Sequence, residues 1–294
     1  MSLPRITIVT PSFNQAKYLE QTIRSVLEQG YPNLEYIICD GGSTDGSLEI
    51  IRKYEKQLAW WCSEKDRGQS HAINKGFEKA TGDLYAYINS DDYFLPGAFD
   101  RVAREYQDGG DVKFIVGWSQ YLEPNGDFRP YPIQQHSEPS DWLIKNPIPQ
   151  QSAFWAASLW QKLGPFREDL HYSFDYEYWL RLRFKGGVGP HILHQCLAVF
   201  RLHEASKTMS SETAFEPDDA ALRREYMPLL PWAERRIVNA ARRRMQARAN
   251  RKAGWAALKN HDVKEARRRA VATVSNAATS LESWRLMFCA LRGH

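Results

Sequence analysis

The chain of 294 residues contains little cysteine: Cys39, Cys62, Cys196 and Cys289 are the four. They lie far apart in the sequence and form neither a CxxC pair nor the spacing of a metal-binding motif. We therefore expect reduced thiols, as in proteins of the cytosol, and no disulfide framework.

Long hydrophobic runs are also missing. The sequence has no run of about eighteen consecutive apolar residues, the length that a membrane-spanning helix needs. The N-terminal segment MSLPRITIVTPSFN lacks the basic region and apolar core of a secretory signal. The sequence therefore predicts a cytoplasmic protein without a membrane span.

Two common nucleotide-binding motifs are absent. No GxxxxGK[ST] occurs, and no GxGxxG follows the first predicted strand, which disfavours P-loop and dinucleotide-binding folds. No internal repeat of fixed period is visible. The composition of 43% hydrophobic, 13% aromatic and 25% charged residues is that of an ordinary globular protein.

Charge is distributed unevenly along the chain. The net charge is only +4, yet residues 231–294 hold fifteen Lys and Arg against four Asp and Glu. Arg triplets stand there beside apolar residues at helical spacing, a pattern typical of basic amphipathic helices, which can lie on anionic lipid headgroups. A solvated or oligomeric helical hairpin is the alternative, and no nucleic-acid partner is expected because no recognised binding motif is present.

Strand and helix patterns alternate over the first hundred residues, which predicts an α/β fold with a mostly parallel central sheet. The expected strands are RITIVTP (5–11), LEYIICD (34–40), LAWWCSE (58–64) and LYAYIN (84–89), and the expected helices cover 17–30, 46–56 and 69–80.

After Val112 the pattern changes. Two β-rich runs flank Pro124, Asn125 and Gly126, which predicts a hairpin. An amphipathic helix is expected over 173–186, and a strand region over 188–203. Beyond Glu216 the composition is helical.

Polar residues follow each of the four predicted strands. In an open parallel sheet, ligands bind outside the carboxyl ends of the strands, so we expect these groups to form one site. They are Thr10, Pro11, Ser12 and Asn14 after the first strand, Asp40 and Gly41 after the second, Asp66 and Gly68 after the third, and Asn89, Asp91 and Asp92 after the fourth.

The adjacent carboxylates of Asp91 and Asp92 repel each other unless something receives them. Mg²⁺ is typically held by one or two carboxylates together with substrate phosphate oxygens and water, so the pair predicts a divalent cation bound beside a diphosphate. The alternative is a helix N-cap before the helix that follows Pro96, which explains one aspartate better than two.

Three segments, TIVTPSFNQAKYLEQTIRSVLEQGYPNLEYIICDGGSTDGS, EKDRGQSHAINKGFEKATGD and INSDD, resemble in order and spacing the nucleotide-binding half of the family 2 inverting glycosyltransferases with the GT-A fold. The resemblance covers roughly residues 5–205. It implies a Rossmann-like, mostly parallel sheet flanked by helices within a domain of residues 1–215. That domain would comprise a nucleotide-binding half (1–92) and an acceptor and catalytic-base half (93–215), with a basic α-helical extension over 216–294.

The resemblance also implies a nucleotide-diphosphate sugar donor. Asp40 would lie at the base, Asp91 near the ribose, and Asp92 on Mg²⁺ or Mn²⁺. Because a carboxylate can accept from the N3 imino group of uracil or thymine, UDP or dTDP is favoured. The other residues expected to contact the donor are Thr10, Pro11, Ser12, Asn14, Gly41, Asp66, Gly68, Gln69 and Asn74.

The segment FRLHEASKT resembles the part of such enzymes that closes over the donor. His203 is expected to join the metal, and Arg201 and Lys207 are expected to pair with phosphate charge. The alternative is a solvated basic loop.

An inverting transfer needs a carboxylate that takes the proton of the acceptor hydroxyl. GPFREDLHYSFDYEYWLRLRFKGG resembles the segment that carries this base, and Asp175 falls on its position. Phe174 replaces the Glu of the usual pair, so Glu177 remains the second candidate for the base. A helix N-cap is the alternative role for Asp175.

The segment NPIPQQSAFW falls where such enzymes shape the acceptor and sugar pocket. The amides of Gln150 and Gln151 complement sugar hydroxyls, and Trp118 is expected to stack on a sugar face, although most aromatics of this chain are expected in the core. The QxxRW pattern of processive members is absent, which predicts one addition per encounter.

We thus expect a metal-dependent inverting glycosyltransferase of the bacterial cytoplasm that acts in cell-surface polysaccharide biosynthesis on a glycan or lipid-linked saccharide, with peripheral membrane contact through its basic helices. One alternative is a nucleotidyltransferase, although TPSFNQAKY is not the Gly-rich, Lys-bearing loop of such enzymes. The other is a catalytically idle protein that binds nucleotide sugars or glycans.

Overall fold

The computed structural model describes residues 3–131, 133, 138–204, 206–207 and 214–292. The chain divides into two compact units, one of residues 1–137 and 146–226, the other of residues 138–145 and 227–294. Residues 216–226, which the sequence placed in the extension, therefore belong to the first unit. The physical reason is the buried Tyr226 at their end, whose hydroxyl donates to Glu177 inside this unit.

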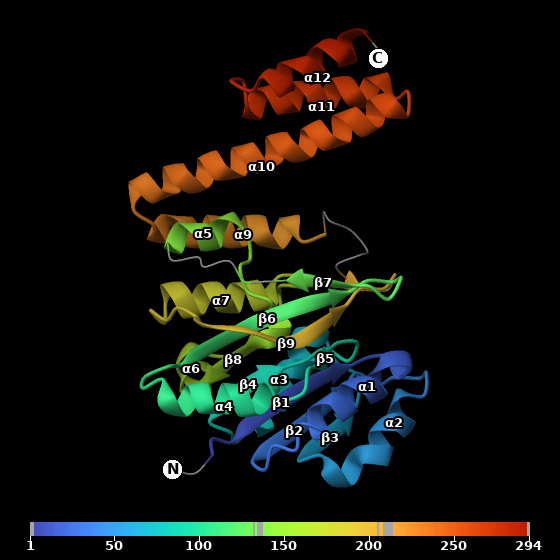
Figure 1. Ribbon diagram of the computed structural model, residues 1–294, viewed down its shortest axis with the longest axis vertical. Coiled ribbons are helices and arrows are strands. Elements are labelled where there is room, and N and C mark those ends of the chain that lie inside the picture. The colour runs from blue at the N-terminus through green and yellow to red at the C-terminus, as the bar shows by residue number, and fades with distance from the viewer. Residues whose placement is uncertain (1–2, 132, 134–137, 205, 208–213, 293–294) are drawn as a thin grey trace. The chain divides into compact units, whose positions relative to one another are not determined.

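The first part of unit 1 alternates strands and helices as the sequence predicted (Figure 1). Residues of β1 are all buried, and α1 buries Leu19, Thr22, Ile23 and Val26 at helical spacing. The elements are β1 (Ile6–Ser12), α1 (Ala16–Leu27), β2 (Leu34–Asp40), α2 (Ser47–Tyr54), a 3₁₀ turn (Glu55–Gln57), β3 (Trp60–Ser63), α3 (Gln69–Lys79) and β4 (Leu84–Tyr87).

The strands of this part pair in parallel, in the order β3-β2-β1-β4. Ser12 lies opposite Asp40, and Asp40 lies opposite Ser63, so the first three strands end level with one another. The loops that follow them consequently meet at one edge of the sheet.

The second part of unit 1 extends the sheet with mostly antiparallel strands, giving the order β3-β2-β1-β4-β8-β6-β9-β5, with β7 paired to β6. The predicted hairpin is confirmed: β6 and β7 are antiparallel, and Gly126 adopts the positive φ of +90° that the turn requires. The elements are β5 (Tyr93–Phe94), α4 (Ala98–Asp108), β6 (Phe114–Leu122), β7 (Phe128–Tyr131), a 3₁₀ turn (Gln150–Ser152), β8 (Ala153–Ala156), α6 (Ala157–Leu163), α7 (Phe174–Phe184), β9 (His191–Arg201) and α9 (Glu216–Tyr226).

Helix α7 was predicted to be amphipathic, and this is wrong. Phe174 and every residue from Tyr176 to Leu182 are buried, so the helix is enclosed on all sides. Glu177 and Arg181, two charged residues of this helix, form an ion pair of 2.7 Å inside the protein. Their mutual pairing is what allows the helix to be buried around its circumference.

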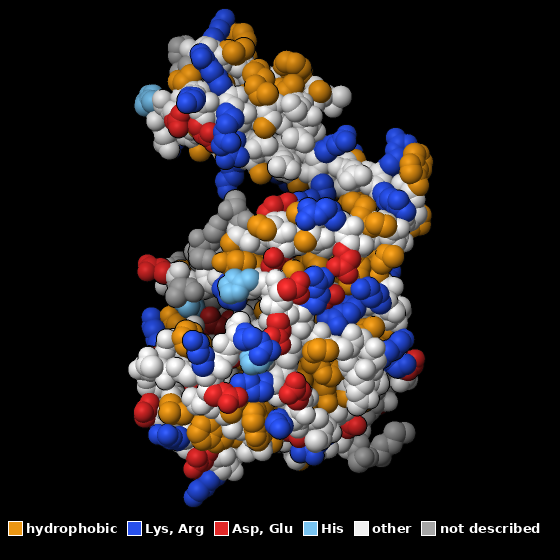
Figure 2. Space-filling view, turned by 180° about the vertical axis from the view of Figure 1, so that it is seen from behind, with side chains coloured by type: hydrophobic (Ala, Val, Ile, Leu, Met, Phe, Trp, Pro, Cys, Tyr) orange, Lys and Arg blue, Asp and Glu red, His pale blue; other side chains and the backbone are white. Residues whose placement is uncertain are grey.

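Unit 2 is helical: α5 (Pro139–Ile144), a 3₁₀ turn (Met227–Leu229), α10 (Trp232–Lys259), α11 (Val263–Asn276) and α12 (Leu281–Arg292). Small side chains let the last three helices approach closely, because a Cβ on Gly254 would meet Leu286 at 2.7 Å. Figure 2 shows hydrophobic side chains at the surface of this unit among Lys and Arg. None of the described helices combines the length and apolar character needed to cross a bilayer. The hydrophobic core of unit 2 comprises Ala257, Leu258, Ala266, Ala270, Leu286 and Ala290.

Candidate active site

A cavity of about 580 Å³ opens in unit 1 where the loops after β1, β3 and β4 face the segments around Gln150, Asp175 and Lys207. This volume is in the range of small-molecule sites. Eleven of the residues that the sequence predicted for the site line it: Pro11, Ser12, Asp66, Gly68, Gln69, Asn89, Asp91, Gln150, Gln151, Asp175 and Lys207.

Nine predicted residues do not line the cavity: Thr10, Asn14, Asp40, Gly41, Asn74, Asp92, Trp118, Arg201 and His203. Most of them hold the loops that form its wall.

Asp40 is the clearest example of a predicted residue that supports a loop behind the cavity lining. Its side chain is only 1% exposed and accepts hydrogen bonds from the backbone N–H groups of Gly42 and Ser43 and from the hydroxyls of Ser43 and Ser63. Asn14, at a positive φ of +51°, accepts from the backbone N–H of Thr44. Asp40 therefore shapes the loop after β2, and its position does not favour the predicted contact with the base.

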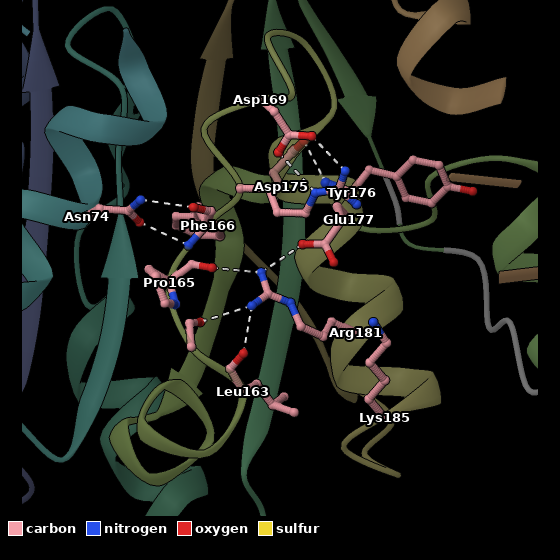
Figure 3. A network of polar contacts seen from close by, with 12 residues as sticks. Asn74, Leu163, Pro165, Phe166, Asp169, Asp175, Tyr176, Glu177, Arg181 and Lys185 are labelled. Carbon is pink, nitrogen blue, oxygen red and sulfur yellow. Dashed lines mark hydrogen bonds and ion pairs between the residues drawn. The ribbon is translucent and has the colours of Figure 1, made fainter. Parts of the chain in front are cut away.

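Thr10 and Asn74, which also do not line the cavity, are hydrogen-bonded to other segments of unit 1. Thr10 is fully buried and shares a hydrogen bond of 3.1 Å with the hydroxyl of Tyr36. Asn74 donates to the carbonyl and accepts from the N–H of Phe166, each at 2.9 Å (Figure 3). Both side chains thus position neighbouring segments, and Asn74 fixes the chain that leads toward α7.

The carboxylate that faces the cavity on the side of β1–β3 is Asp66. Its Oδ1 accepts from the backbone N–H of Gly68 at 2.9 Å. A Cβ at position 41 would lie 2.6 Å from its Oδ2, so Gly41 makes room for this carboxylate. Beside it lies Phe13, which lines the cavity and is 61% exposed. The sequence analysis missed Phe13, although an aromatic residue among the polar residues after the first predicted strand was a usable signal.

Asp91 and Asp92 point in different directions. Asp91 lines the cavity, and its Oδ2 lies 3.0 Å from Nε2 of His203. Asp92 is fully buried, where it accepts from the backbone N–H of Arg201 at 2.9 Å and from Nε2 of Gln151 at 3.0 Å. Burial, together with the neighbouring charge of Asp91, raises the pKa of Asp92 well above its usual value.

The predicted roles of the two aspartates stay predictions, but their positions bear on them. The predicted metal ligand, Asp92, does not line the cavity, and its carboxylate oxygens accept hydrogen bonds within the protein. It is no helix cap either, because α4 begins only at Ala98. Arg201, predicted to meet phosphate, instead donates through Nε to the carbonyl oxygen of Asp91 at 3.0 Å and so holds this loop.

Asp91 and His203 fit a divalent cation in chemistry, since a carboxylate oxygen and an imidazole nitrogen lie within 3.0 Å of each other. Within the described part of the chain, no three His, Cys, Asp or Glu side chains gather into a complete metal cage. A cation here would therefore need further ligands from a bound phosphate or water.

A chain of side-chain amides crosses the floor of the cavity. Nζ of Lys207 donates to Gln69 at 3.0 Å, and Gln69 donates to Oδ1 of Asn89 at 2.6 Å. Asn89 donates to Gln150 at 3.4 Å, and Gln150 donates to the carbonyl of Tyr87 at 2.7 Å. Each amide is oriented by the next, so Gln69, Gln150 and Lys207 are linked through Asn89, which was also expected at the site but without a specific contact.

The opposite wall is aromatic. Tyr121 stacks on Tyr131 at a centroid distance of 4.8 Å and lies 5.4 Å from Phe200, and all three line the cavity. Trp118 does not line it and packs edge-on against His194 instead. The predicted stacking role of Trp118 therefore does not match its position.

Asp175 lies in the first turn of α7 and faces the cavity. Burial raises its pKa to about 6, and the charge of Asp219 adds to this effect. The backbone N–H of Tyr176 and the positive charge of Lys207 act in the opposite direction. A carboxyl group with this pKa is largely ionised at neutral pH yet remains a better proton acceptor than an ordinary aspartate.

Glu177, the other candidate for the base, is 1% exposed and does not line the cavity. It pairs with Arg181 at 2.7 Å and accepts from the hydroxyl of Tyr226 at 2.9 Å. Figure 3 shows this pair, with the Arg181 guanidinium also directed at backbone oxygens that include those of Leu163 and Pro165. The geometry therefore separates the two acids and leaves Asp175 as the one at the cavity.

The start of α7 is held by α9. Asp218 accepts from the backbone N–H of Tyr172 at 2.8 Å and of Ser173 at 3.2 Å, while Asp219 accepts from the Ser173 hydroxyl at 2.7 Å. These contacts fix the turn that presents Asp175. They were not predicted, because α9 had been assigned to the extension.

Comparison with known sequences gives consistent matches. The family model described as glycosyl transferase family 2 matches residues 7–174. An uncharacterized glycosyltransferase of Mycobacterium tuberculosis is 31% identical over 182 residues, which cover 61% of this chain and 69% of that protein. TuaG of Bacillus subtilis, named for teichuronic acid biosynthesis, is 28% identical over 203 residues, covering 68% of this chain and 79% of TuaG.

Solved structures confirm the predicted GT-A fold. A crystal structure of TarS from S. aureus superposes with a TM-score of 0.61 at 17% identity, covering 99% of this chain and 92% of that chain. The mannosyltransferase PcManGT from Pyrobaculum calidifontis gives a TM-score of 0.54 at 19% identity, covering 100% of this chain and 86% of the other.

Proposed function

The chain belongs to glycosyl transferase family 2, and from this premise we propose that it transfers a sugar from a nucleoside-diphosphate sugar to a hydroxyl group of a glycan or lipid-linked saccharide. We further propose that the transfer is metal-dependent, inverts the anomeric centre and adds one sugar per encounter. The observation that carries the proposal is a single cavity lined by Asp91 and by Asp175, with His203 bonded to the first of them.

The donor nucleotide is proposed to lie against the loops after β1 and β3. Phe13 offers an exposed ring for stacking on a base, and Asp66 offers a carboxylate that can accept from the N3 imino group of uracil or thymine. A UDP or dTDP donor follows from this chemistry. Crystal structures of TarS with UDP-GlcNAc and with UDP support the choice.

The diphosphate is proposed to meet Asp91 and His203 through Mg²⁺ or Mn²⁺. Such an ion would neutralise the charge that develops on the leaving diphosphate. PcManGT, which shares the fold, was solved with GDP-Man and Mn²⁺. The amine of Lys207, held by Gln69, adds a positive charge at the same cavity.

Asp175 is proposed as the catalytic base. It would accept the proton of the acceptor hydroxyl as that oxygen attacks the anomeric carbon from the face opposite the diphosphate. The bond between the anomeric carbon and the phosphate oxygen breaks as the new glycosidic bond forms, which inverts the centre. The raised pKa suits the role, because a base with a pKa close to the working pH accepts a proton most effectively.

The acceptor is proposed to rest on the aromatic wall formed by Tyr121, Tyr131 and Phe200. Flat apolar rings complement the C–H faces of pyranoses, and the amides of Gln150 and Gln151 complement hydroxyl groups. A role in bacterial cell-surface polysaccharide synthesis, at the cytoplasmic side and with peripheral membrane contact, is proposed from the name of TuaG and from the basic helices.

A thermal-shift panel of nucleoside diphosphates and their sugars, with and without Mn²⁺, tests the donor and the metal together. A ligand that binds only the folded state raises the melting temperature, and the rise grows with the logarithm of its concentration relative to its dissociation constant. We expect the largest shift from a uridine or thymidine diphosphate sugar in the presence of Mn²⁺.

Phe13→Ala should reduce that shift, whereas Phe128→Ala, which alters an aromatic of similar 54% exposure outside the cavity, should not. Donor turnover in the same samples separates an enzyme from an idle binding protein. A wild-type turnover that EDTA leaves unchanged would contradict the proposed metal.

A further inference from the structure

The last helix of unit 2, α12, carries two apolar faces, of which only one is used by the fold. Ser283, Leu286 and Ala290 are buried against the neighbouring helices. Leu281, Trp284, Phe288 and Leu291 are 87%, 52%, 54% and 60% exposed. Their spacing of three, four and three residues places them in one stripe along the helix. These four residues are called the α12 stripe below.

Arginine side chains flank the α12 stripe. Arg285 follows Leu281 by one helical turn, and the guanidinium of Arg292 lies 4.0 Å from the ring centroid of Phe288. Arg267 of α11 donates to the backbone oxygens of Ala290 and Leu291 at the end of the helix. The apolar stripe is thus bordered by cations, whose long stems can lie along it while the charges reach outward.

The position of Trp284 adds to this pattern. Its indole Nε1–H already donates to the carbonyl of Ala278 at 2.7 Å, so its polar group is satisfied while its ring stays half exposed. An indole with one satisfied edge and an open apolar face suits the boundary between lipid headgroups and acyl chains, where Trp is enriched.

We infer that the α12 stripe docks on an anionic phospholipid surface, with the helix lying in the plane of the interface. Twelve residues make a helix of about 18 Å, which is too short to cross a bilayer but long enough to lie in the headgroup region. The inference deepens the membrane contact proposed above, since it names the helix face and the lipid charge, and it does not depend on the donor chemistry.

Charge complementarity favours a lipid surface over a second copy of the chain. Residues 231–294 hold fifteen Lys and Arg against four Asp and Glu. A symmetric pairing of two α12 stripes would bring Arg285 and Arg292 of both copies together, and like charges oppose such a contact. An anionic surface instead attracts each exposed cation, an effect that salt weakens.

Co-sedimentation of the full chain with vesicles tests the inference. We expect binding to vesicles of phosphatidylcholine mixed with phosphatidylglycerol, weak binding to phosphatidylcholine alone, and weaker binding in high salt. The double variant Trp284→Gln with Phe288→Gln should lower the partition coefficient about tenfold or more, because two large apolar side chains no longer enter the interface.

The matched control is Ile237→Gln with Met245→Gln, which alters two exposed side chains on α10, 55% and 42% exposed. It should bind vesicles as the wild type does. Equal losses in both double variants, or no loss in the stripe variant, would overturn the inference. So would a wild type that ignores anionic vesicles but forms a dimer, measured by light scattering, that the stripe variant breaks. Donor turnover in solution should be the same in all of these proteins, so the membrane contact and the catalytic proposal fail separately.

Discussion

Unit 1 contains two pairs of neighbouring acidic residues, Asp91 with Asp92 and Asp175 with Glu177, and the two pairs are arranged in the same way. At the end of β4, Asp91 lines the cavity while Asp92 is buried among hydrogen-bond donors. At the start of α7, Asp175 lines the cavity while Glu177 is buried against Arg181. In each pair one carboxylate lines the cavity, and the other is bonded to groups of the protein.

The two buried acids differ in how their charge is balanced. Glu177 has the cation of Arg181 as its partner, whereas Asp92 accepts from the backbone N–H of Arg201 and the amide of Gln151. Burial and the neighbouring charge of Asp91 raise the pKa of Asp92. A buried carboxylate whose oxygens already accept hydrogen bonds from protein groups has few lone pairs available for a ligand. The comparison teaches that burial can divide neighbouring acids into one that lines the cavity and one that is bonded within the protein.

The largest effect is expected from Asp175→Asn. Loss of the proton acceptor should lower the rate of transfer by about 10²–10⁴-fold, while the thermal shift given by the donor changes little. The melting temperature of the free variant should not fall at neutral pH. The reason is that burial raises the pKa of Asp175 in the folded state, so its ionised form opposes folding above its ordinary pKa.

Asp169→Asn is a suitable control, since this exposed carboxylate pairs with Arg167 outside the cavity. It should transfer sugar at close to the wild-type rate. Equal activity in Asp175→Asn and the wild type would remove Asp175 from the mechanism.

Asp91→Ala and Asp92→Asn should behave in opposite ways. Asp91→Ala should lower Mn²⁺-stimulated turnover by about 10²–10³-fold, which corresponds to the several kcal/mol that a metal ion supplies. Asp92→Asn should keep its response to Mn²⁺ and change the free energy of unfolding little at neutral pH, because loss of one acceptor oxygen is offset by removal of a buried charge that burial and Asp91 disfavour. Titration of turnover with Mn²⁺, alongside urea unfolding, measures both effects. The reverse pattern would restore Asp92 as the metal ligand.

Glu177→Ala tests the structural member of the second pair. Removal of one partner of a buried ion pair should lower the free energy of unfolding by roughly 3–5 kcal/mol, because Arg181 loses its counter-charge. Urea unfolding followed by circular dichroism gives this value. Turnover per folded molecule should remain near that of the wild type at low temperature, and a stable but inactive Glu177→Ala would identify Glu177 as the base after all.

The pH profile of kcat/KM tests the pKa of Asp175. A general base must be unprotonated, so the rate should fall about tenfold for each pH unit below about 6 and level off above it. A profile that stays flat down to pH 5 would show that no group with this pKa controls the reaction. In Asp175→Asn, the decrease of kcat/KM below about pH 6 should be absent. If Asp175 had only a structural role, the variant would keep this decrease.

The smallest effect is expected from Tyr226→Phe. The variant removes the hydroxyl that donates to Glu177 at 2.9 Å and leaves the ring in place. A single such bond is worth about 0.5–1.5 kcal/mol, or more when the acceptor is charged, so the midpoint of urea unfolding should shift slightly and the rate of transfer should not. A loss as large as that of Glu177→Ala would mean that α9 supports α7 more strongly than this contact implies.

Local patterns predicted most of the first half of the fold. Alternating apolar strands and amphipathic helices are encoded within short windows, so β1 to β4 and their helices were found together with the edge where their loops meet. Prediction was weaker for α7, because Glu177 and Arg181 are charged residues that are buried as an ion pair. It was also weaker for α9, because this helix packs through contacts with residues far away in the sequence, such as that of Tyr226 with Glu177.

The candidate site shows the same limit. The sequence alone determined the family, the sheet edge that carries the site, and the kinds of side chain that meet there, because strand period and loop chemistry are local properties. Only the tertiary structure decided that Asp91 faces the cavity rather than Asp92, Asp175 rather than Glu177, and Tyr121 and Tyr131 rather than Trp118. Two neighbouring acids are equivalent until distant donors, such as the backbone N–H of Arg201 and the hydroxyl of Tyr226, satisfy one of them and leave the other for a ligand.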